Sequence, residues 1–219
     1  MARAVLAVLF DLDGTLADTA PDLADALNRL RQRRRLPPLA QPVIRPHASH
    51  GARGLLHIGF GLGPEDNDFP ALREALLETY AANLCNRTRL FPGIDAVLRQ
   101  LEQRRIPWGI VTNKPARFTQ PLVDRLGLAQ RAATVISGDS CAHPKPHPEP
   151  LRCASREIGV PASACLYIGD AQRDAEAALA AGMTAVVARY GYLGENDHPQ
   201  DWRAHHLIDA PAEILGLLE

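Results

Sequence analysis

The chain has 219 residues, of which 46% are hydrophobic, and its formal net charge at pH 7 is -1. This length and composition suit one well-packed core with a smaller second unit, and they exclude an intrinsically disordered chain. A nucleic-acid-binding domain is normally clearly basic, and a membrane span needs about 20 apolar residues in a row, so we expect neither a nucleic-acid nor a membrane partner.

The first predicted element is an unbroken apolar run, Val5–Phe10, that stops at the sequence DLDGT of residues 11–15. Such a run is typical of a strand buried on both faces of a parallel sheet. Because side chains alternate along a strand, Asp11 and Asp13 should point the same way, with Leu12 in the core. Two carboxylates at a strand end predict a cation site. The alternative is that Asp and Gly merely end the strand, since both are turn formers.

Residues 18–88 show helical patterns only. Apolar residues at helical spacing predict helices at 21–35, 51–60 and 70–84, and no strand pattern appears before Leu90. We therefore predict that residues 18–88 form a helical cap domain inserted into a core of residues 1–17 and 89–219. Such a cap closes over a site, excludes water and reads the non-reacting part of a small substrate.

The entry to the second cap helix is polar and contains glycine. For each side chain there, the alternative to substrate recognition is a solvated loop or helix start. The candidates for substrate selection are Arg45, Ser49, His50 and Arg53.

From Phe91 onward, helices and strands alternate. Helices are predicted at 94–104, 114–126, 148–158, 171–181 and 212–217, and strands at 108–112, 134–137, 165–168, 184–188 and near 207–208. This alternation predicts an α/β fold of the Rossmann-like kind, a parallel sheet with helices on both faces. The polar stretch 191–203 is the expected mobile loop of this core.

A third carboxylate, Asp170, follows the buried strand predicted at 165–168. Strand ends of a parallel sheet share one edge, so Asp170 should lie near Asp11. With the main-chain carbonyl of Asp13, these carboxylates predict an oxygen-only site suited to Mg2+. Asp174 lies i+4 from Asp170 on a predicted helix, on the same face, where it can hold Asp170 or bound water. Alternatively, Asp174 serves only the helix dipole.

Two further strand ends or loops offer groups for a phosphate. Thr112 ends a strand before Asn113, and its hydroxyl with the neighbouring N–H groups predicts contact with a phosphoryl oxygen, although Thr is also a common strand-end residue. Lys145 stands between two prolines, which restrict the backbone and aim the ammonium group. The alternative for Lys145 is a surface side chain in a proline-rich loop.

In order and spacing, residues 11–15, 111–113, 144–146 and 168–174 resemble the four motifs of the haloacid dehalogenase (HAD) superfamily of phosphotransferases. The resemblance covers nearly the whole chain. It implies a Rossmann-like HAD core with an inserted helical cap of the C1 type and a bound Mg2+ ion. Dehalogenases of this superfamily lack a carboxylate at the position of Asp13, so its presence favours phosphoryl transfer over carbon–halogen chemistry.

The same resemblance implies catalytic roles. Asp11 would attack phosphorus and become an aspartyl phosphate, while Asp13 would protonate the leaving oxygen and then deprotonate the hydrolytic water. Lys145 would pair with the nucleophile and the phosphoryl group. Metal ligands would be Asp11, Asp13 and Asp170, with Asp174 in support, and the phosphate-binding residues would be Gly14, Thr112, Asn113 and Lys145.

At whole-chain level the sequence resembles the phosphoglycolate phosphatase group. Residues 111–118 and 189–192 resemble a bacterial branch of which some members dephosphorylate N-acetylmuramic acid 6-phosphate. Both substrates carry a carboxylate, so we expect a small carboxylate-bearing phosphomonoester, and the residues do not choose between the two. A phosphomutase of the same superfamily and a non-catalytic binding protein on the same fold stay open as alternatives.

The four cysteines form no C-x-x-C pair, and no secretion signal is recognisable. We therefore expect reduced thiols and a cytoplasmic protein. Three cap histidines, His47, His50 and His57, have spacings that a zinc site can use, but no further ligand clearly completes one. The sequence gives no indication of the oligomeric state.

Overall fold

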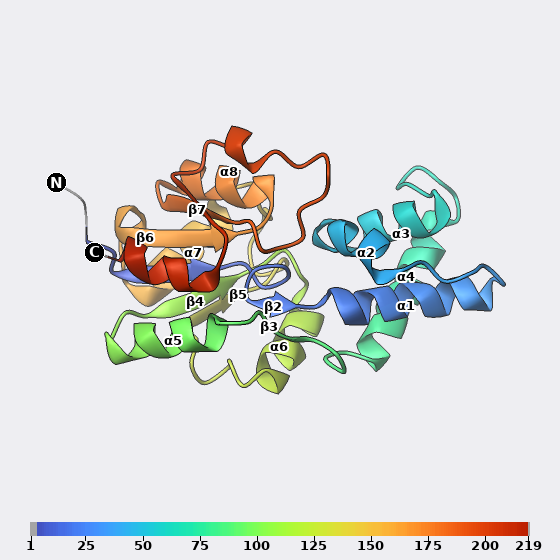
Figure 1. The fold of residues 1–219 in the computed structure, drawn as a ribbon, viewed down its shortest axis with the longest axis horizontal. Helices are drawn as coiled ribbons and strands as arrows, with labels where there is room; N and C mark the ends of the chain where they lie inside the picture. Colours follow the sequence, from blue (N-terminus) through green and yellow to red (C-terminus); the bar gives the residue numbers. More distant parts are fainter. Residues whose placement is uncertain (1–3, 219) are drawn as a thin grey trace. The chain divides into compact units, whose positions relative to one another are not determined.

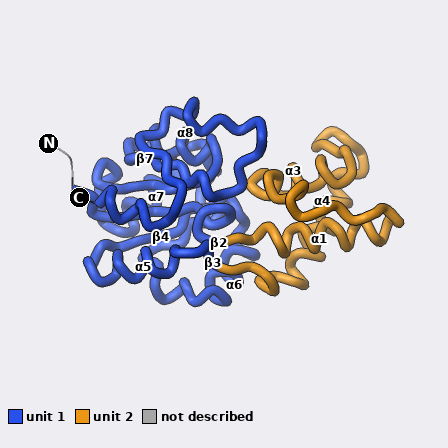
Figure 2. The backbone as a smooth tube through the Cα atoms, in the orientation of Figure 1, with its two compact units in different colours: residues 1–17, 90–219 blue, residues 18–89 orange. Residues whose placement is uncertain are grey.

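The computed structural model describes residues 4–218 (Figure 1). The chain divides into two compact units (Figure 2). Unit 1 contains Met1–Ala17 and Leu90–Glu219, and unit 2 contains Asp18–Arg89. The chain therefore leaves unit 1 soon after its first strand and returns to it after completing unit 2.

Unit 1 is built on a parallel sheet whose strands follow the order β5-β4-β1-β6-β7-β8. The strands are β1 (Ala7–Phe10), β4 (Trp108–Val111), β5 (Thr134–Ile136), β6 (Cys165–Gly169), β7 (Thr184–Ala188) and β8 (His206–Ile208). The prediction of a parallel α/β sheet is confirmed.

The burial of the central strand β1 on both faces explains its apolar sequence. All of Ala7–Phe10 is 0% exposed. Leu9 belongs to a core cluster with side chains of α7 and α8, such as Leu151 and Ala177. Because side chains alternate along a strand, Phe10 faces the other side. There its ring and the Trp108 ring pack edge to face, with their centroids 6.4 Å apart. A strand that is covered on both faces requires apolar residues at every position.

The helices of unit 1 follow the strands in sequence. They are α5 (Ile94–Gln103), α6 (Ala116–Arg125), α7 (Glu149–Ile158) and α8 (Gln172–Ala181), with 3₁₀ segments η2 (Ala162–Ala164), η3 (Pro199–Asp201) and η4 (Pro211–Leu217). α8 packs on β6 and β7, α7 packs on β4 and β5, and α5 packs on η4. Buried leucines and alanines at helical spacing supply these contacts.

Unit 2 contains helices α1 (Ala20–Arg33), α2 (Gln41–Ile44), α3 (Gly51–Phe60) and α4 (Phe69–Ala82), and the 3₁₀ segment η1 (Arg45–His50). α1 packs against α3 and α4 through fully buried residues such as Leu27 and Leu56. Two short strands, β2 (Ala17–Asp18) and β3 (Arg89–Leu90), pair where the chain passes between the units.

Several elements differ from the sequence pattern in their bounds or their type. α6 begins at Ala116 rather than at residue 114, because Asp139 accepts a hydrogen bond from the Ala116 N–H at 2.9 Å and caps the helix there. Residues 211–217 form a 3₁₀ rather than an α-helix. Residues 41–50 contain short helical segments that the pattern missed, because prolines interrupt its period. Among the described residues, no helix has the length and apolar character needed to cross a bilayer.

Candidate active site

The candidate site lies where the central strands of unit 1 end. β1 is flanked by β4 and β6. After β1, the chain adds β4 and β5 on one side of it and then β6, β7 and β8 on the other. Ligands of open α/β sheets bind at such a reversal, beyond the carboxyl ends of the strands. Phe10 is in register with Ile168, and the Asp11 N–H donates to the Ile168 carbonyl at 2.8 Å. The residues that follow β1 and β6 therefore start at the same level of the sheet edge.

A buried ammonium group stands at the centre of this edge. The Nζ of Lys145 lies 3.0 Å from Oδ1 of Asp11 and 2.7 Å from Oδ1 of Asp174. It also donates to the Tyr167 hydroxyl at 2.7 Å and to the Val111 carbonyl at 2.9 Å. The Lys145 side chain is 0% exposed, so it is not a surface lysine. Its three N–H donors are shared among four acceptors, which hold it in one position.

Asn113 holds the backbone of the Lys145 loop. Its Oδ1 accepts from the Lys145 N–H at 2.9 Å, and its Nδ2 donates to the Lys145 carbonyl at 2.9 Å. This pair of hydrogen bonds ties the loop to the end of β4. The Asn113 side chain is thus committed to positioning Lys145, and its expected contact with phosphate stays a prediction.

Asp11 is 3% exposed and is held through one oxygen. Its Oδ1 accepts from the Leu12 N–H at 2.8 Å and faces Lys145, whereas no described residue donates to Oδ2. Burial raises the pKa of Asp11, and the Lys145 ammonium partly offsets this rise. One carboxylate oxygen is therefore fixed by protein donors, and the other is available to a cation or a substrate.

Asp13 forms an ion pair with a second lysine, Lys114. The Nζ of Lys114 lies 2.8 Å from Oδ1 of Asp13, and both side chains are largely buried. No role was predicted for Lys114 from the sequence. Its only signal was its place directly after Asn113 at the end of β4, where a side chain reaches the same sheet edge.

Three carboxylates converge beside Lys145. One oxygen from each of Asp11, Asp170 and Asp174 lies within 4.8 Å of the others, and all three residues are buried. Burial, with the charges of Asp11 and Asp174, raises the pKa of Asp170 to about 7. A set of crowded, buried carboxylate oxygens of this kind fits a hard divalent cation such as Mg2+.

Two glycines allow the backbone to approach Asp170. A Cβ on Gly14 would stand 2.1 Å from Oδ2 of Asp170, and one on Gly191 would stand 2.3 Å from its Cβ. Gly14 also has φ +85°, which disfavours other residues. The Tyr192 N–H donates to Oδ2 of Asp170 at 2.9 Å. The carboxylate therefore sits in a tight backbone cradle.

Asp174 divides its two oxygens between a helix cap and the site. Its Oδ2 accepts from the Ala171 N–H at 3.1 Å at the start of α8, while Oδ1 faces Lys145. Burial raises the pKa of Asp174, but the charges of Lys145 and Arg173 outweigh it and hold this pKa below its usual value. Asp174 thus does more than complement the dipole of α8.

Tyr167 is a further residue of the site, and the sequence pattern did not identify it. The Tyr167 hydroxyl donates to the Val111 carbonyl at 2.9 Å and accepts from Lys145. Burial raises the pKa of this phenol well above its usual value, so it stays protonated. A tyrosine inside an otherwise aliphatic strand was the available signal, because a buried hydroxyl needs partners.

The two other expected phosphate contacts have partners within the protein. The Thr112 hydroxyl accepts from the Lys114 N–H at 3.2 Å, and the Gly14 N–H donates to the Ala17 carbonyl at 3.0 Å. Both residues lie at the sheet edge with Asp11 and Asp170, but these bonds fix local turns. Phosphate binding by Thr112 and Gly14 stays a prediction.

The residues expected to select the substrate lie in unit 2. Arg45 donates to both carboxylate oxygens of Asp18 at 2.8 Å. Arg53 and His50 are exposed and Ser49 is half-buried, in η1 and the first turn of α3. A role in selectivity stays a prediction for all four residues.

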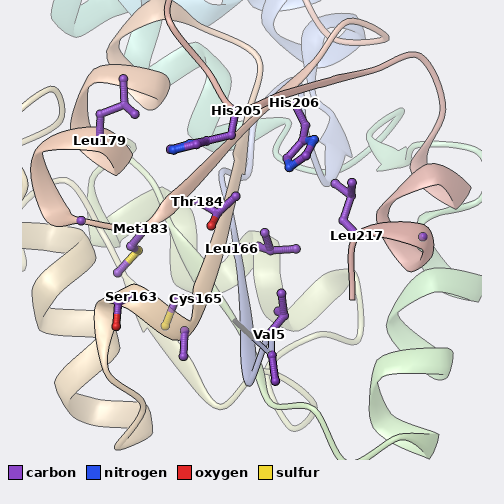
Figure 3. A pocket seen from close by; sticks show the side chains of 14 residues that line it. Val5, Ser163, Cys165, Leu166, Leu179, Met183, Thr184, His205, His206 and Leu217 are labelled. Carbon is purple, nitrogen blue, oxygen red and sulfur yellow. The ribbon is translucent and has the colours of Figure 1, made fainter. Parts of the chain in front are cut away.

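A pocket of about 640 Å³ lies elsewhere in unit 1. It is lined by residues at the beginnings of strands, including Cys165, Thr184 and His206, together with Val5 and Met183 (Figure 3). The carboxylates stand at the opposite ends of the same strands. This pocket is therefore separate from the candidate site.

Comparisons with known proteins show what this chain is similar to. A family model described as haloacid dehalogenase-like hydrolase matches residues 8–188. A phosphoglycolate phosphatase from Xanthomonas campestris is 43% identical over 212 residues, covering 95% of this chain and 94% of that protein. An N-acetylmuramic acid 6-phosphate phosphatase from Pseudomonas putida is 38% identical over 213 residues, covering 97% and 96%. The crystal structure of a predicted phosphoglycolate phosphatase from Haemophilus somnus superposes with a TM-score of 0.85, at 28% identity and 98% coverage of both chains.

Proposed function

Because this chain belongs to the haloacid dehalogenase-like hydrolases and is a phosphoric monoester hydrolase, we propose that it is a Mg2+-dependent phosphatase that works through an aspartyl phosphate on Asp11. Its substrate is a small phosphomonoester that also carries a carboxylate. The observation that carries this proposal is the buried Lys145 ammonium, placed between Asp11 and Asp174 beside a third carboxylate.

The metal site is proposed from the donor set. Mg2+ would be held by the carboxylates of Asp11 and Asp170 and by the main-chain carbonyl of Asp13. Asp174 would support the site through its contact with Lys145. Oxygen-only ligands and the raised pKa of Asp170 support this assignment. When bound, the ion supplies positive charge that lets a carboxylate approach a phosphate group bearing nearly two negative charges.

In the first half-reaction, a carboxylate oxygen of Asp11 attacks phosphorus and the bond to the leaving oxygen breaks. Lys145 holds Asp11 at 3.0 Å and stabilises charge on the transferring phosphoryl group. Asp13 gives a proton to the leaving oxygen as general acid. Lys114 keeps the Asp13 carboxyl group in place through its contact at 2.8 Å.

In the second half-reaction, Asp13 takes a proton from water, and the water oxygen attacks the phosphorus of the aspartyl phosphate. Phosphate leaves and Asp11 is regenerated. The exclusion of bulk water during the first step is assigned to unit 2, which we propose acts as a cap over the site. Arg45, Ser49, His50 and Arg53 are proposed to read the part of the substrate that does not react.

The substrate class rests on the relatives. The Xanthomonas protein is named a phosphoglycolate phosphatase and the Pseudomonas protein an N-acetylmuramic acid 6-phosphate phosphatase. Both named substrates combine a phosphate with a carboxylate. We therefore propose one of these two compounds as the substrate and the cytoplasm as the location.

The test is a panel of kcat/KM values for 2-phosphoglycolate, N-acetylmuramic acid 6-phosphate and neutral sugar phosphates, measured with Mg2+ and with EDTA. We expect one carboxylate-bearing substrate to be preferred and EDTA to abolish phosphate release. Preference for neutral sugar phosphates would reject the substrate class. Retained phosphate and a bisphosphate intermediate would indicate a phosphomutase, and a lack of turnover on every substrate would indicate a binding protein.

A further inference from the structure

A second group of potential metal ligands lies on the loop that carries Lys145. His143 and His147 stand two residues before and two residues after Lys145, and Glu149 is the first residue of α7. One ligand atom from each of these three side chains lies within 4.8 Å of the others. Unlike the buried carboxylates, both histidines are exposed and Glu149 is half-buried, so the group is open to ions from solvent.

The contacts hold this group together. Nδ1 of His143 lies 2.9 Å from Oε2 of Glu149, and the His143 N–H donates to the same oxygen at 3.1 Å. Nδ1 of His147 lies 3.9 Å from that oxygen and accepts from the Glu149 N–H at 3.2 Å. The two imidazole rings have centroids 4.5 Å apart. The rings of His143 and His147 thus lie together beside Glu149, with Nδ1 of His143 on its carboxylate and Nδ1 of His147 on its N–H.

From this arrangement we infer that His143, His147 and Glu149 form a second metal site, selective for a borderline transition-metal ion such as Zn2+, with water completing the coordination. Imidazole nitrogens favour Zn2+, Ni2+ and Cu2+ over Mg2+, whereas the buried carboxylates favour Mg2+. Two histidines with one glutamate and an open position form a recurrent zinc ligand set. The site binds an ion of a different class from the one proposed for catalysis.

Two nearby features bear on the affinity. The amino end of α7 carries partial positive charge, which disfavours a cation, and the Glu149 carboxylate offsets it. Cys141 lies close by, but burial and the neighbouring Cys153 raise the pKa of its thiol to about 11. The Cys141 thiol is not among the ligand atoms that lie within 4.8 Å of one another in this group, so Cys141 is not counted as a ligand.

The location gives the site a structural consequence. An ion that bridges His143 and His147 ties together the two ends of the segment that positions Lys145. Bound metal therefore stabilises the folded loop, since it binds the folded chain in preference to the unfolded one.

The test is calorimetric titration of Zn2+ into protein saturated with Mg2+, so that the carboxylate site is already filled. We expect one Zn2+ per chain, with affinity reduced about tenfold or more in His143→Ala and in His147→Ala, since loss even of a supporting group costs ten- to a hundredfold. His198→Ala is the matched control, because it removes another exposed histidine of unit 1. Cys141→Ser should leave the affinity unchanged.

Cu2+ electron paramagnetic resonance supplies a second measurement. Splitting from imidazole nitrogens is expected in the wild type and should be lost in the His143→Ala/His147→Ala double variant. Zn2+ binding that is lost in Asp170→Asn but survives in both single histidine variants would assign the ion to the carboxylate site and overturn the inference. The absence of Zn2+ binding at saturating Mg2+ would also overturn it.

Discussion

The Nζ of Lys145 lies 3.0 Å from Oδ1 of Asp11, although the two residues come from parts of the chain far apart in sequence, and both side chains are buried. Neither group can rely on water for solvation. Each therefore depends on the other, and the pair links the stability of unit 1 to the chemistry proposed for it.

The first prediction concerns this dependence. Lys145→Met keeps the side-chain length but leaves Asp11 and Asp174 buried without the ammonium, so the free energy of unfolding should fall by about 3–5 kcal/mol. Urea unfolding without added metal measures it. Arg104→Met removes an exposed cation and should change stability by less than about 0.5 kcal/mol. Equal stability of wild type and Lys145→Met would contradict the importance of the buried pair.

The second prediction concerns the nucleophile. Asp11→Asn preserves size and shape but removes the attacking charge, so kcat on an aryl phosphate should drop by at least about a thousandfold. Asp25→Asn breaks an exposed ion pair with Arg29 and should leave turnover unchanged. Phosphate release should be followed with circular dichroism as a check of folding. Substantial turnover by a folded Asp11→Asn variant would show that another group attacks phosphorus.

The third prediction concerns metal and pH. Burial and neighbouring carboxylates raise the pKa of Asp170 to about 7, above its ordinary value of 3.8. The folded chain then holds this proton more tightly than the unfolded chain. The proton on Asp170 therefore stabilises the folded state. This contribution to the free energy of unfolding is complete below pH 3.8 and is lost as the pH rises through about 7.

Since Mg2+ and the proton compete for the Asp170 carboxylate, the rise in Tm caused by Mg2+ should be larger near pH 8 than near pH 5. Differential scanning calorimetry at both values, with and without EDTA, measures this difference. Asp170→Asn should abolish it. A Mg2+ effect of the same size at both pH values, or one that persists in Asp170→Asn, would place the ion elsewhere.

The fourth prediction concerns Lys114, which contacts Asp13 at 2.8 Å. Lys114→Met should lower kcat about tenfold or more by releasing the carboxyl group assigned to acid and base catalysis, with little change in KM. Lys114→Arg should recover part of the activity because it restores a cation. If kcat stays the same while KM rises, Lys114 instead contributes to substrate binding.

The fifth prediction concerns Arg53, an exposed cation in the first turn of α3. Arg53→Ala should lower kcat/KM about tenfold for the preferred carboxylate-bearing substrate, while turnover of an aryl phosphate stays close to wild type. Arg73→Ala, an exposed arginine of α4, is the matched control. An equal loss on both substrates would exclude a role in selectivity.

Much of the fold could be predicted from local patterns. The apolar run before Asp11, the alternation after Phe91 and the turn residues between elements specify the parallel sheet, because burial on both faces demands apolar residues at every strand position. The helical segments within residues 41–50 were not predicted, because short segments that contain prolines leave no periodic signal.

The sequence by itself determined which residues stand at strand ends, and so it placed Asp11, Asp170 and Thr112 along one edge of the sheet. Only the tertiary structure decided which of them touch. The commitment of Asn113 to the Lys145 backbone and the pairing of Lys114 with Asp13 depend on distances across the sheet. Strand periodicity fixes the direction of a side chain, whereas long-range packing fixes its partner, and the charge balance of the site follows from the partners.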